Sequence, residues 1–159
     1  MANFRLSLDE FDEVDYDLIA IHTSLEDYHL AFLINQNFPV LLSRNTSNIQ
    51  VKTKDGEASF SRFTFDATDS GLSWNLLQNR NESTLEGFTA GGLFSDGAVE
   101  VASRAYLLPE LKKVDYFLKI ENAETDPEDI IERLNSIERI STVYQVNASQ
   151  IKSKNNIII

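Results

Sequence analysis

Short apolar runs and amphipathic stretches alternate along the chain, which predicts both strands and helices. Leu18–Ile21 is apolar on both faces of an extended segment, and this pattern predicts a strand inside a sheet. The next stretch carries apolar positions at helical spacing. Thr23 and Glu26 have the spacing of a capping box, so we expect the helix to begin there. It should end near Asn37, because the residue before Pro39 disfavours helical angles.

The middle of the chain has the pattern of an antiparallel sheet. Ile49–Val51 is followed by Asp55-Gly56, a dipeptide that favours a hairpin turn. Phe60–Phe65 carries aromatic side chains on both faces of the expected strand. A turn at Asp69–Gly71 then leads into Leu72–Leu76, where apolar and polar positions alternate again.

The second half returns to a clear pattern after two weaker segments. Asn79–Thr84 is polar and is expected to form a loop, while residues 87–104 contain four glycines and predict no regular element. Tyr116–Ile120 and Ile140–Val146 each predict a strand. The chain ends on the apolar tail Ile157–Ile159, which favours pairing as an edge strand over exposure to water.

The second predicted helix has the clearer start. Asp126 is a good N-cap, and Pro127 suits the first helical position. Apolar residues then recur at helical spacing, so we expect a helix over Pro127–Ile137. Asp129 and Arg133 have the spacing of a favourable i,i+4 ion pair.

These elements together predict a single α+β domain over residues 1–159, with a mostly antiparallel sheet and two main helices on one face. A ferredoxin-like fold, or a related regulatory-domain arrangement, accommodates this order of elements. Val14–Leu18 and Val114–Leu118 share four of five residues. The echo has two explanations: a duplicated strand–helix unit with two equivalent sites, or a coincidence in a short window. We favour coincidence, because the remaining parts of the two halves do not align.

The amino-acid composition limits the fold class, the cysteine chemistry and the compartment that we expect. The 159 residues are 42% hydrophobic and include ten Phe, which indicates a globular fold with one real core. The absence of Cys excludes disulfides, thiol nucleophiles and cysteine zinc sites, and it fits a reducing compartment. No apolar signal-peptide core follows Met1, and no apolar run approaches the ~18 residues of a spanning helix. We therefore expect a cytoplasmic protein.

The chain is strongly acidic, with a formal net charge of −11. Such a charge repels phosphate backbones, so a nucleic-acid partner is not expected. The clustered basic candidates are Lys112-Lys113 and Lys152 with Lys154. Solubility is the simplest explanation of the acidity.

The most distinctive motif is Pro109-Glu110 and, after three intervening residues, Val114-Asp115-Tyr116. With Leu108 in place of Ile, this pattern resembles the IPExxxVDY family of small bacterial proteins. Leu25–Tyr28 and Lys152–Lys154 add to the resemblance, which extends over most of the chain. The family is named after the motif, and the resemblance implies no particular reaction, ligand or cofactor.

The motif has two interpretations. A functional one places Asp115 and Tyr116 at the rim of a pocket that binds a polar ligand. A structural one, which we favour, has Pro109 fix the approach to the strand and Glu110 cap a turn at Leu111–Lys113. Asp115 would then accept hydrogen bonds from the backbone or from a Tyr hydroxyl. Alternation along a strand places Asp115 and Tyr116 on opposite faces, so the motif cannot line one pocket.

Other candidate residues carry weaker indications. His22 and His29 would need further ligands for zinc, so we expect no metal site. The carboxylates of Asp9–Asp17 lack the glycine and the terminal Glu of an EF-hand loop, and general acid–base catalysis would need them in one cleft. Gly91-Gly92 lacks the context of a phosphate loop. Trp74 and its neighbouring aromatic residues could stack on bases, but with few basic residues beside them we expect core packing: Phe60, Phe63, Phe65.

The leading hypothesis is a non-catalytic binding or protein-interaction module, with Pro109–Tyr116 at or near the contact. Its partner would be a protein or a small metabolite, with no cofactor and no membrane partner. Ile157–Ile159 could also form the edge of a homodimer. The alternative is a small carboxylate-dependent enzyme, assisted by a divalent cation, with Glu110, Asp115 and Tyr116 as acid, base or ligand groups. An RNA-associated factor is a weaker third class.

Overall fold

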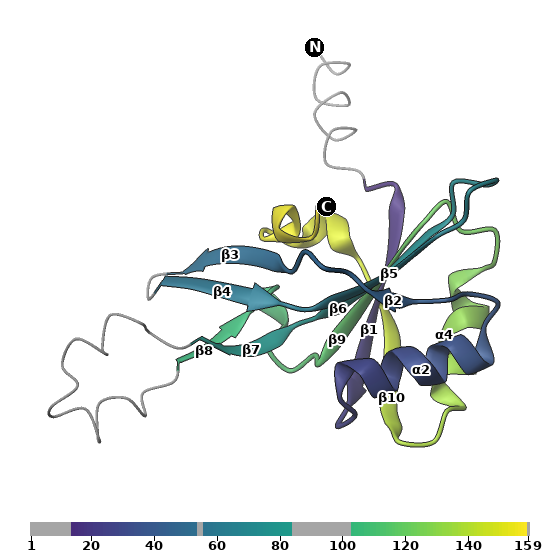
Figure 1. The fold of residues 1–159 in the computed structure, drawn as a ribbon, viewed down its shortest axis with the longest axis horizontal. Helices are drawn as coiled ribbons and strands as arrows, with labels where there is room; N and C mark the ends of the chain where they lie inside the picture. The colour runs from purple at the N-terminus through teal and green to yellow at the C-terminus, as the bar shows by residue number, and fades with distance from the viewer. Residues whose placement is uncertain (1–13, 54–55, 84–102, 159) are drawn as a thin grey trace, which may run out of the picture.

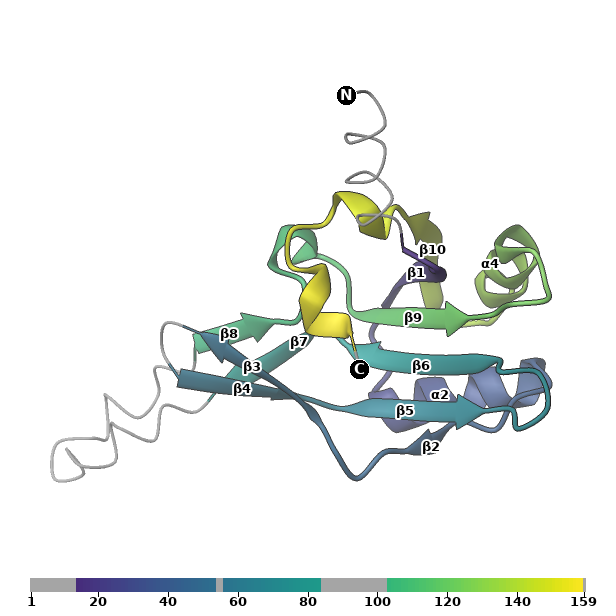
Figure 2. The same cartoon turned by 90° about the horizontal axis from the view of Figure 1, so that it is seen from above.

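A computed structural model describes residues 14–53, 56–83 and 103–158 of the chain. Within these residues, six strands form one antiparallel sheet in the order β10-β1-β9-β6-β5-β2 (Figures 1 and 2). The strands are β1 (Tyr16–Thr23), β2 (Ser43–Arg44), β5 (Arg62–Asp66), β6 (Ser73–Gln78), β9 (Tyr116–Glu121) and β10 (Ile140–Val146). The other regular elements are the hairpins β3 (Ile49–Thr53) with β4 (Gly56–Phe60) and β7 (Arg80–Ser83) with β8 (Ser103–Tyr106), and the helices α2 (Asp27–Asn37) and α4 (Pro127–Asn135).

The connectivity places two strand–helix units side by side. If β2 to β5 and the β7–β8 pair are set aside, the chain runs β1-α2-β6-β9-α4-β10, and the four strands lie in the order β10-β1-β9-β6. This β-α-β-β-α-β order is the ferredoxin-like arrangement that the sequence suggested. β5 and β2 extend the sheet beyond β6. The α+β class with a mostly antiparallel sheet and two helices is therefore confirmed.

The sheet has an apolar core on each face. Both helices pack on one face, where Leu30 and Ile34 of α2 meet Leu134 of α4 over Ile19 and Leu118 of the sheet (Figure 1). The opposite face is covered by the β3–β4 hairpin, by β8 and by the C-terminal segment, which crosses over the sheet in Figure 2. Because β1 and β9 contribute to both cores, they are apolar on both faces, as the sequence predicts for central strands.

The first helix begins later than predicted. The Thr23 hydroxyl accepts a hydrogen bond from the Leu25 amide at 3.1 Å and donates one to the Arg139 carbonyl at 2.7 Å. Thr23 still belongs to β1, so it cannot cap α2. Glu26 occupies the N-cap position without a side-chain cap, and the helix ends at Asn37 as expected. In α4, by contrast, the side chain of Asp126 caps the helix by accepting from the Glu128 amide at 3.1 Å.

Three further predictions, for the middle and the end of the chain, have different outcomes. The hairpin before Gly56 is present, although residues 54 and 55 of its turn lie outside the described part. The expected loop Asn79–Thr84 is wrong, because Arg80–Ser83 forms β7 against β8. The expected edge strand at Ile157–Ile159 is wrong in its described part: Lys154–Ile157 is a 3₁₀ helix, and Ile157 is fully buried. Of the segment 87–104, for which no regular element was expected, residues 87–102 lie outside the described part, whereas Ser103 and Arg104 belong to β8.

The aromatic residues of the middle segment pack in the core as predicted. Phe60 is buried on the face opposite the helices, whereas Phe63 and Trp74 are buried on the helix face. The expected strand Phe60–Phe65 is divided at Ser61: β4 ends before it and β5 begins after it, in two different sheets. The aromatic side chains still occur on both faces, because Phe60 and Phe63 lie an odd number of positions apart in extended chain.

The echo between the two strand–helix units does not mark a duplicated site. Tyr16 packs against the core on the face opposite the helices, whereas Tyr116 belongs to the core under the helices. The two residues therefore point to opposite faces of the sheet, and the explanation by coincidence is the better one. Within the described part of the chain, none of the helices is both long and apolar enough to cross a membrane.

Candidate functional site

The Pro109–Tyr116 motif runs from the surface into the core. Pro109 begins a short 3₁₀ helix over Pro109–Leu111, where both Pro109 and Glu110 are exposed. Val114 is buried on the face opposite the helices, and Tyr116 is buried under the helices. The structure thus places the motif residues along one turn and does not gather them in one pocket. Regular strand alternation would put Val114 and Tyr116 on the same face, so it does not extend back from β9 to Val114.

Glu110 fastens the C-terminal segment to the motif. Its carboxylate accepts a hydrogen bond from the Ser153 amide at 2.9 Å and another from the Ser153 hydroxyl. Partial burial acts to raise the pKa of Glu110, but the hydrogen bonds from Ser153 outweigh it and lower this pKa below its ordinary value. The expected role of Glu110 as a cap of the turn at Leu111–Lys113 is wrong, because its contacts lie with Ser153.

Asp115 and Tyr116 also have intramolecular partners. One carboxylate oxygen of Asp115 accepts from the Thr23 amide at 2.8 Å, and the other forms an ion pair with Arg80. The Tyr116 hydroxyl donates to the Leu25 carbonyl at 2.8 Å. Burial, together with the nearby carboxylates of Asp27 and Asp115, raises the pKa of Tyr116 far above its ordinary value. These contacts favour the structural interpretation of the motif.

Asn79 organises the motif turn, and the sequence analysis missed it. Its side chain is 0% exposed. Its amide group donates to the carbonyls of Leu111 at 2.9 Å and Val114 at 2.7 Å, and its oxygen accepts from the Leu108 amide at 2.9 Å. Asn79 lies in a polar stretch, between Gln78 and Arg80, and gives no sequence indication of such a role, because its partners lie about thirty positions further along the chain.

Lys119 is a second buried polar residue that the sequence did not reveal. It is 3% exposed, on the face opposite the helices. Its ammonium group donates to the Ile157 carbonyl at 2.8 Å, pairs with Glu121 at 3.1 Å, and lies 4.7 Å from the centre of the Tyr16 ring. Lys119 and Glu110 therefore hold the C-terminal segment at two points. This packing buries Ile157, so Ile157 is not available for the homodimer edge that was expected at Ile157–Ile159.

The basic residues near the motif lie on an open surface. Lys112 and Lys152, from the two predicted basic clusters, line a shallow depression together with Glu110 and Ser153. Lys112 lies 5.7 Å from the centre of the Tyr106 ring. The depression is not enclosed, and the carboxylate of Glu110 lies within it, so it does not form a dedicated anion site.

The two histidines have different contact partners and do not share a site. His22 is within hydrogen-bond distance of the Tyr144 hydroxyl, at 3.0 Å, and His29 stacks beside Tyr28. Among the described residues, no three His, Cys, Asp or Glu side chains gather as metal ligands. Asp9–Glu13 and Gly91-Gly92 lie outside the described residues.

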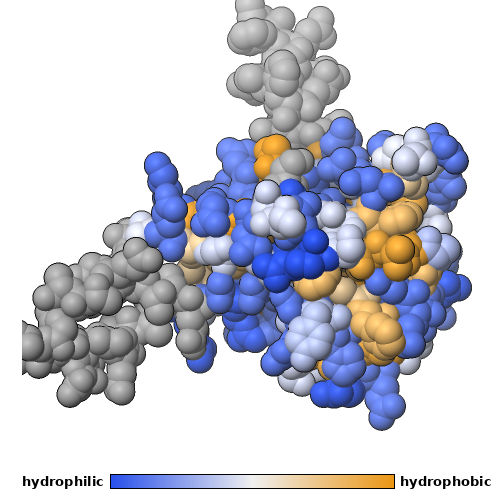
Figure 3. All heavy atoms as spheres, viewed as in Figure 1, coloured by the Kyte–Doolittle hydropathy of each residue, from blue (hydrophilic) through white to orange (hydrophobic). Residues whose placement is uncertain are grey.

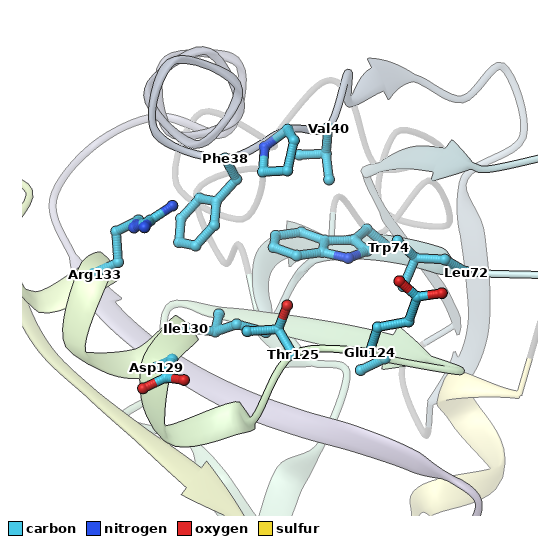
Figure 4. Close-up of a pocket in the computed structure, with 11 residues that line it drawn as sticks. Phe38, Val40, Leu72, Trp74, Glu124, Thr125, Asp129, Ile130 and Arg133 are labelled. Carbon is cyan, nitrogen blue, oxygen red and sulfur yellow. The ribbon is translucent and has the colours of Figure 1, made fainter. Parts of the chain in front are cut away.

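A cavity on the helix face is the best-formed candidate site. It has a volume of about 290 Å³ and lies between the end of α2, the start of β6 and the first turns of α4 (Figure 4). Its apolar walls include Phe38, Leu72, Trp74 and Ile130. Phe38 and Trp74 meet with ring centroids 5.3 Å apart, and their planes are inclined by 55°. Ligand pockets commonly combine such apolar walls with a few polar groups.

Charged side chains surround this cavity. Arg133 lies at one end, with its guanidinium 5.5 Å from the centre of the Phe38 ring and donating to the Asn37 carbonyl at 3.1 Å. Glu124 lies at the other end, near Leu72 and the Trp74 ring (Figure 4). The predicted i,i+4 ion pair between Asp129 and Arg133 is not formed, because Arg133 turns toward Phe38 instead.

Sequence reasoning did not find this cavity. Its lining residues come from three segments, 38–40, 72–74 and 123–133, which only the fold brings together. Trp74 was the one residue with a usable indication, since the chain's single Trp fits either a core or a binding surface. Comparisons of the chain with protein-family models, curated proteins and solved structures found no match.

Proposed function

We propose that this protein is a non-catalytic binding module that holds a small ligand in the cavity beside Trp74. The cavity itself carries the proposal: its volume of about 290 Å³ lies just below the range of roughly 300–1,000 Å³ that is usual for small-molecule sites. Its walls offer aromatic and aliphatic surface, and its rim offers Arg133, Glu124 and Asp129. A ligand of one or two rings, with a polar group at its end, fits these features.

The geometry gives less support to the alternative, a carboxylate-dependent enzyme. Glu110 and Asp115 would serve as acid and base. In the structure, however, Glu110 accepts a hydrogen bond from Ser153, and Asp115 accepts one from Thr23 and forms an ion pair with Arg80. Catalytic groups must instead be able to reach a substrate's proton. The motif therefore remains a predicted stabilising element, and the resemblance to the IPExxxVDY family remains a prediction that rests on the motif residues.

A protein partner is a second candidate, favoured by one observation. Tyr28 and Phe32, one helical turn apart on α2, are 62% and 56% exposed, and Leu41 after the helix is also exposed. Figure 3 shows apolar surface on the side of the molecule that carries α2. Exposed aromatic residues of this kind are frequent in protein interfaces. Pull-down with Phe32→Ser beside the unaltered protein tests this candidate, and equal recovery of every partner contradicts it.

The ligand proposal has a direct spectroscopic test, because Trp74 is the chain's single Trp. A panel of one- and two-ring compounds is titrated while Trp fluorescence and the melting temperature are recorded. A ligand that binds only the folded protein shifts the fluorescence and raises the melting temperature, by an amount that grows with its concentration.

A matched pair of variants locates the binding. Ala123 lines the cavity, so Ala123→Met fills part of it and should abolish both responses. Ala67 lies in the turn before β6, outside the cavity lining, so Ala67→Met should leave both responses intact. If no compound of the panel moves either signal, or if Ala123→Met binds as well as the unaltered protein, the cavity is not the ligand site.

A further inference from the structure

The charges around the cavity define the class of its ligand. Building on the proposed function, we infer that the cavity beside Trp74 selects a small organic cation, in which an ammonium group is attached to an apolar ring or chain. Glu124 would receive the ammonium group, and the aromatic walls would receive the apolar body.

Glu124 is the free charge at the mouth of the cavity. It has no hydrogen bond or ion pair with any other side chain in the described part of the chain, and it lines the cavity together with Trp74 (Figure 4). Asp129, which also lines the cavity, is likewise without an ion pair among the described residues. Two carboxylates thus face one guanidinium around the rim, which favours a positively charged ligand.

Arg133 already has two partners within the protein. Its guanidinium lies over the Phe38 ring, and it donates to the Asn37 carbonyl at the end of α2. These contacts join α4 to the chain after α2 and make Arg133 part of the wall. An anionic ligand would have to compete with them, whereas a cation at Glu124 has no such competitor.

The aromatic walls strengthen the same preference. The face of a Trp ring carries negative electrostatic potential and attracts a cation within about 6 Å. Trp74 and Glu124 line the same cavity, so a cation held by Glu124 can also contact the face of the Trp74 ring (Figure 4). The apolar remainder of the ligand can then occupy the space bounded by Phe38, Leu72 and Ile130.

The charge of the whole chain acts in the same direction. With a formal net charge of −11, the protein raises the local concentration of cations and lowers that of anions. This long-range effect is screened by salt over about 10 Å at 0.1 M ionic strength. A preference that persists at high salt would therefore come from Glu124 and Trp74, and one that disappears would come from the net charge.

The test uses three probes of similar size and different charge: 2-phenylethylamine, 2-phenylethanol and 3-phenylpropionate. Their dissociation constants are measured by Trp74 fluorescence at low and at high salt. We expect the amine to bind roughly threefold to tenfold more tightly than the alcohol, and the propionate to bind most weakly, in line with one exposed charge pair and one cation–π contact.

Matched variants assign the preference to Glu124. Glu124→Gln should make the amine and the alcohol bind equally. Glu132→Gln removes the same charge from an exposed position of α4 that does not line the cavity, and it should leave the preference almost unchanged. Both side chains are exposed, so neither change should affect folding, which urea titration of each variant checks.

The outcomes separate this inference from the proposed function. If the alcohol binds the unaltered protein as tightly as the amine, the cavity binds apolar ligands without charge selection, and only the inference is wrong. If the propionate binds best, Arg133 sets the specificity and the inference is again wrong. If none of the three probes perturbs Trp74 while other compounds of the panel do, the inference fails and the binding module stands. If the whole panel fails as well, both fail.

Discussion

Asn79 provides the sharpest test of how this fold is held together. Its fully buried side chain satisfies three backbone groups of the motif turn: the Leu111 and Val114 carbonyls and the Leu108 amide. Asn79→Ala removes all three hydrogen bonds and leaves these groups buried without partners. At about 1 kcal/mol for each bond, with some compensation by entering water, we expect the free energy of unfolding to fall by about 2–4 kcal/mol.

The loss should be visible in two assays. Urea unfolding should show a lower midpoint with an unchanged slope, since the surface exposed on unfolding stays nearly the same. The melting temperature should fall by roughly 5–15 °C, because a domain of this size loses roughly 2–4 °C per kcal/mol. Asn155→Ala is the control, since Asn155 is exposed and its side chain makes no hydrogen bond within the described residues.

A second substitution tests the direction of the hydrogen bonds. Asn79→Asp keeps the acceptor for the Leu108 amide but turns a carboxylate toward the Leu111 and Val114 carbonyls. This variant should be less stable than Asn79→Ala at pH 7 and should recover part of the difference in acid, where its carboxyl group can donate. If Asn79→Ala costs no more than Asn155→Ala, the turn does not depend on Asn79 and the argument is wrong.

Four further predictions concern single positions. Asp115→Asn should lower the free energy of unfolding by about 1–3 kcal/mol in urea titrations, because it removes the charge that pairs with Arg80; unchanged or higher stability would favour a functional role. Glu110→Gln should destabilise the protein at pH 7, and the difference should shrink as the pH falls below about 4.5, because hydrogen bonds lower the pKa of Glu110 in the folded state. Asp17→Asn should show the opposite trend. Burial and then Asp126 raise the pKa of Asp17, so the folded state binds the proton of this carboxyl group more tightly than the unfolded state does. The variant should therefore gain stability relative to the unaltered protein as the pH rises above about 3.8. A stability difference independent of pH contradicts either pH prediction. Arg139 has a φ of +77°, so Arg139→Gly should relieve strain and raise the melting temperature, and a lower value would contradict this.

The order of elements could be predicted from the sequence because local patterns decide it. Leu18–Ile21 and Tyr116–Ile120 are apolar on both faces, which marks the two central strands. Asp126 and Pro127 mark the start of α4 for local reasons as well. Thr23 misled the prediction of the first cap, because β1 extends to Thr23, where its hydroxyl donates to the carbonyl of Arg139, a residue 116 positions away. Local spacing carries no information about such a competitor.

The candidate site was harder to predict because tertiary contacts alone define it. Strand alternation was the basis for expecting Asp115 and Tyr116 on opposite faces, but it could not identify Ser153 as the partner of Glu110. The β7 strand at Arg80–Ser83 escaped prediction because its polar sequence has no apolar alternation and depends on pairing with β8. The cavity likewise depends on three distant segments, so no single stretch of sequence indicates it.

The structure separates the residues that stabilise the fold from those that form the cavity. In the β6–β9 pair, Gln78 lies opposite Tyr116 at the motif end, and Ser73 lies opposite Glu121 at the cavity end. The five steps from Ser73 to Gln78, at about 3.4 Å each, separate the two regions by roughly 17 Å. Changes that far apart, with no shared partners, usually act independently. Stability lost at Asn79 should therefore leave ligand affinity at the cavity unchanged in the folded protein, and the motif can be retained for the fold while the function lies elsewhere.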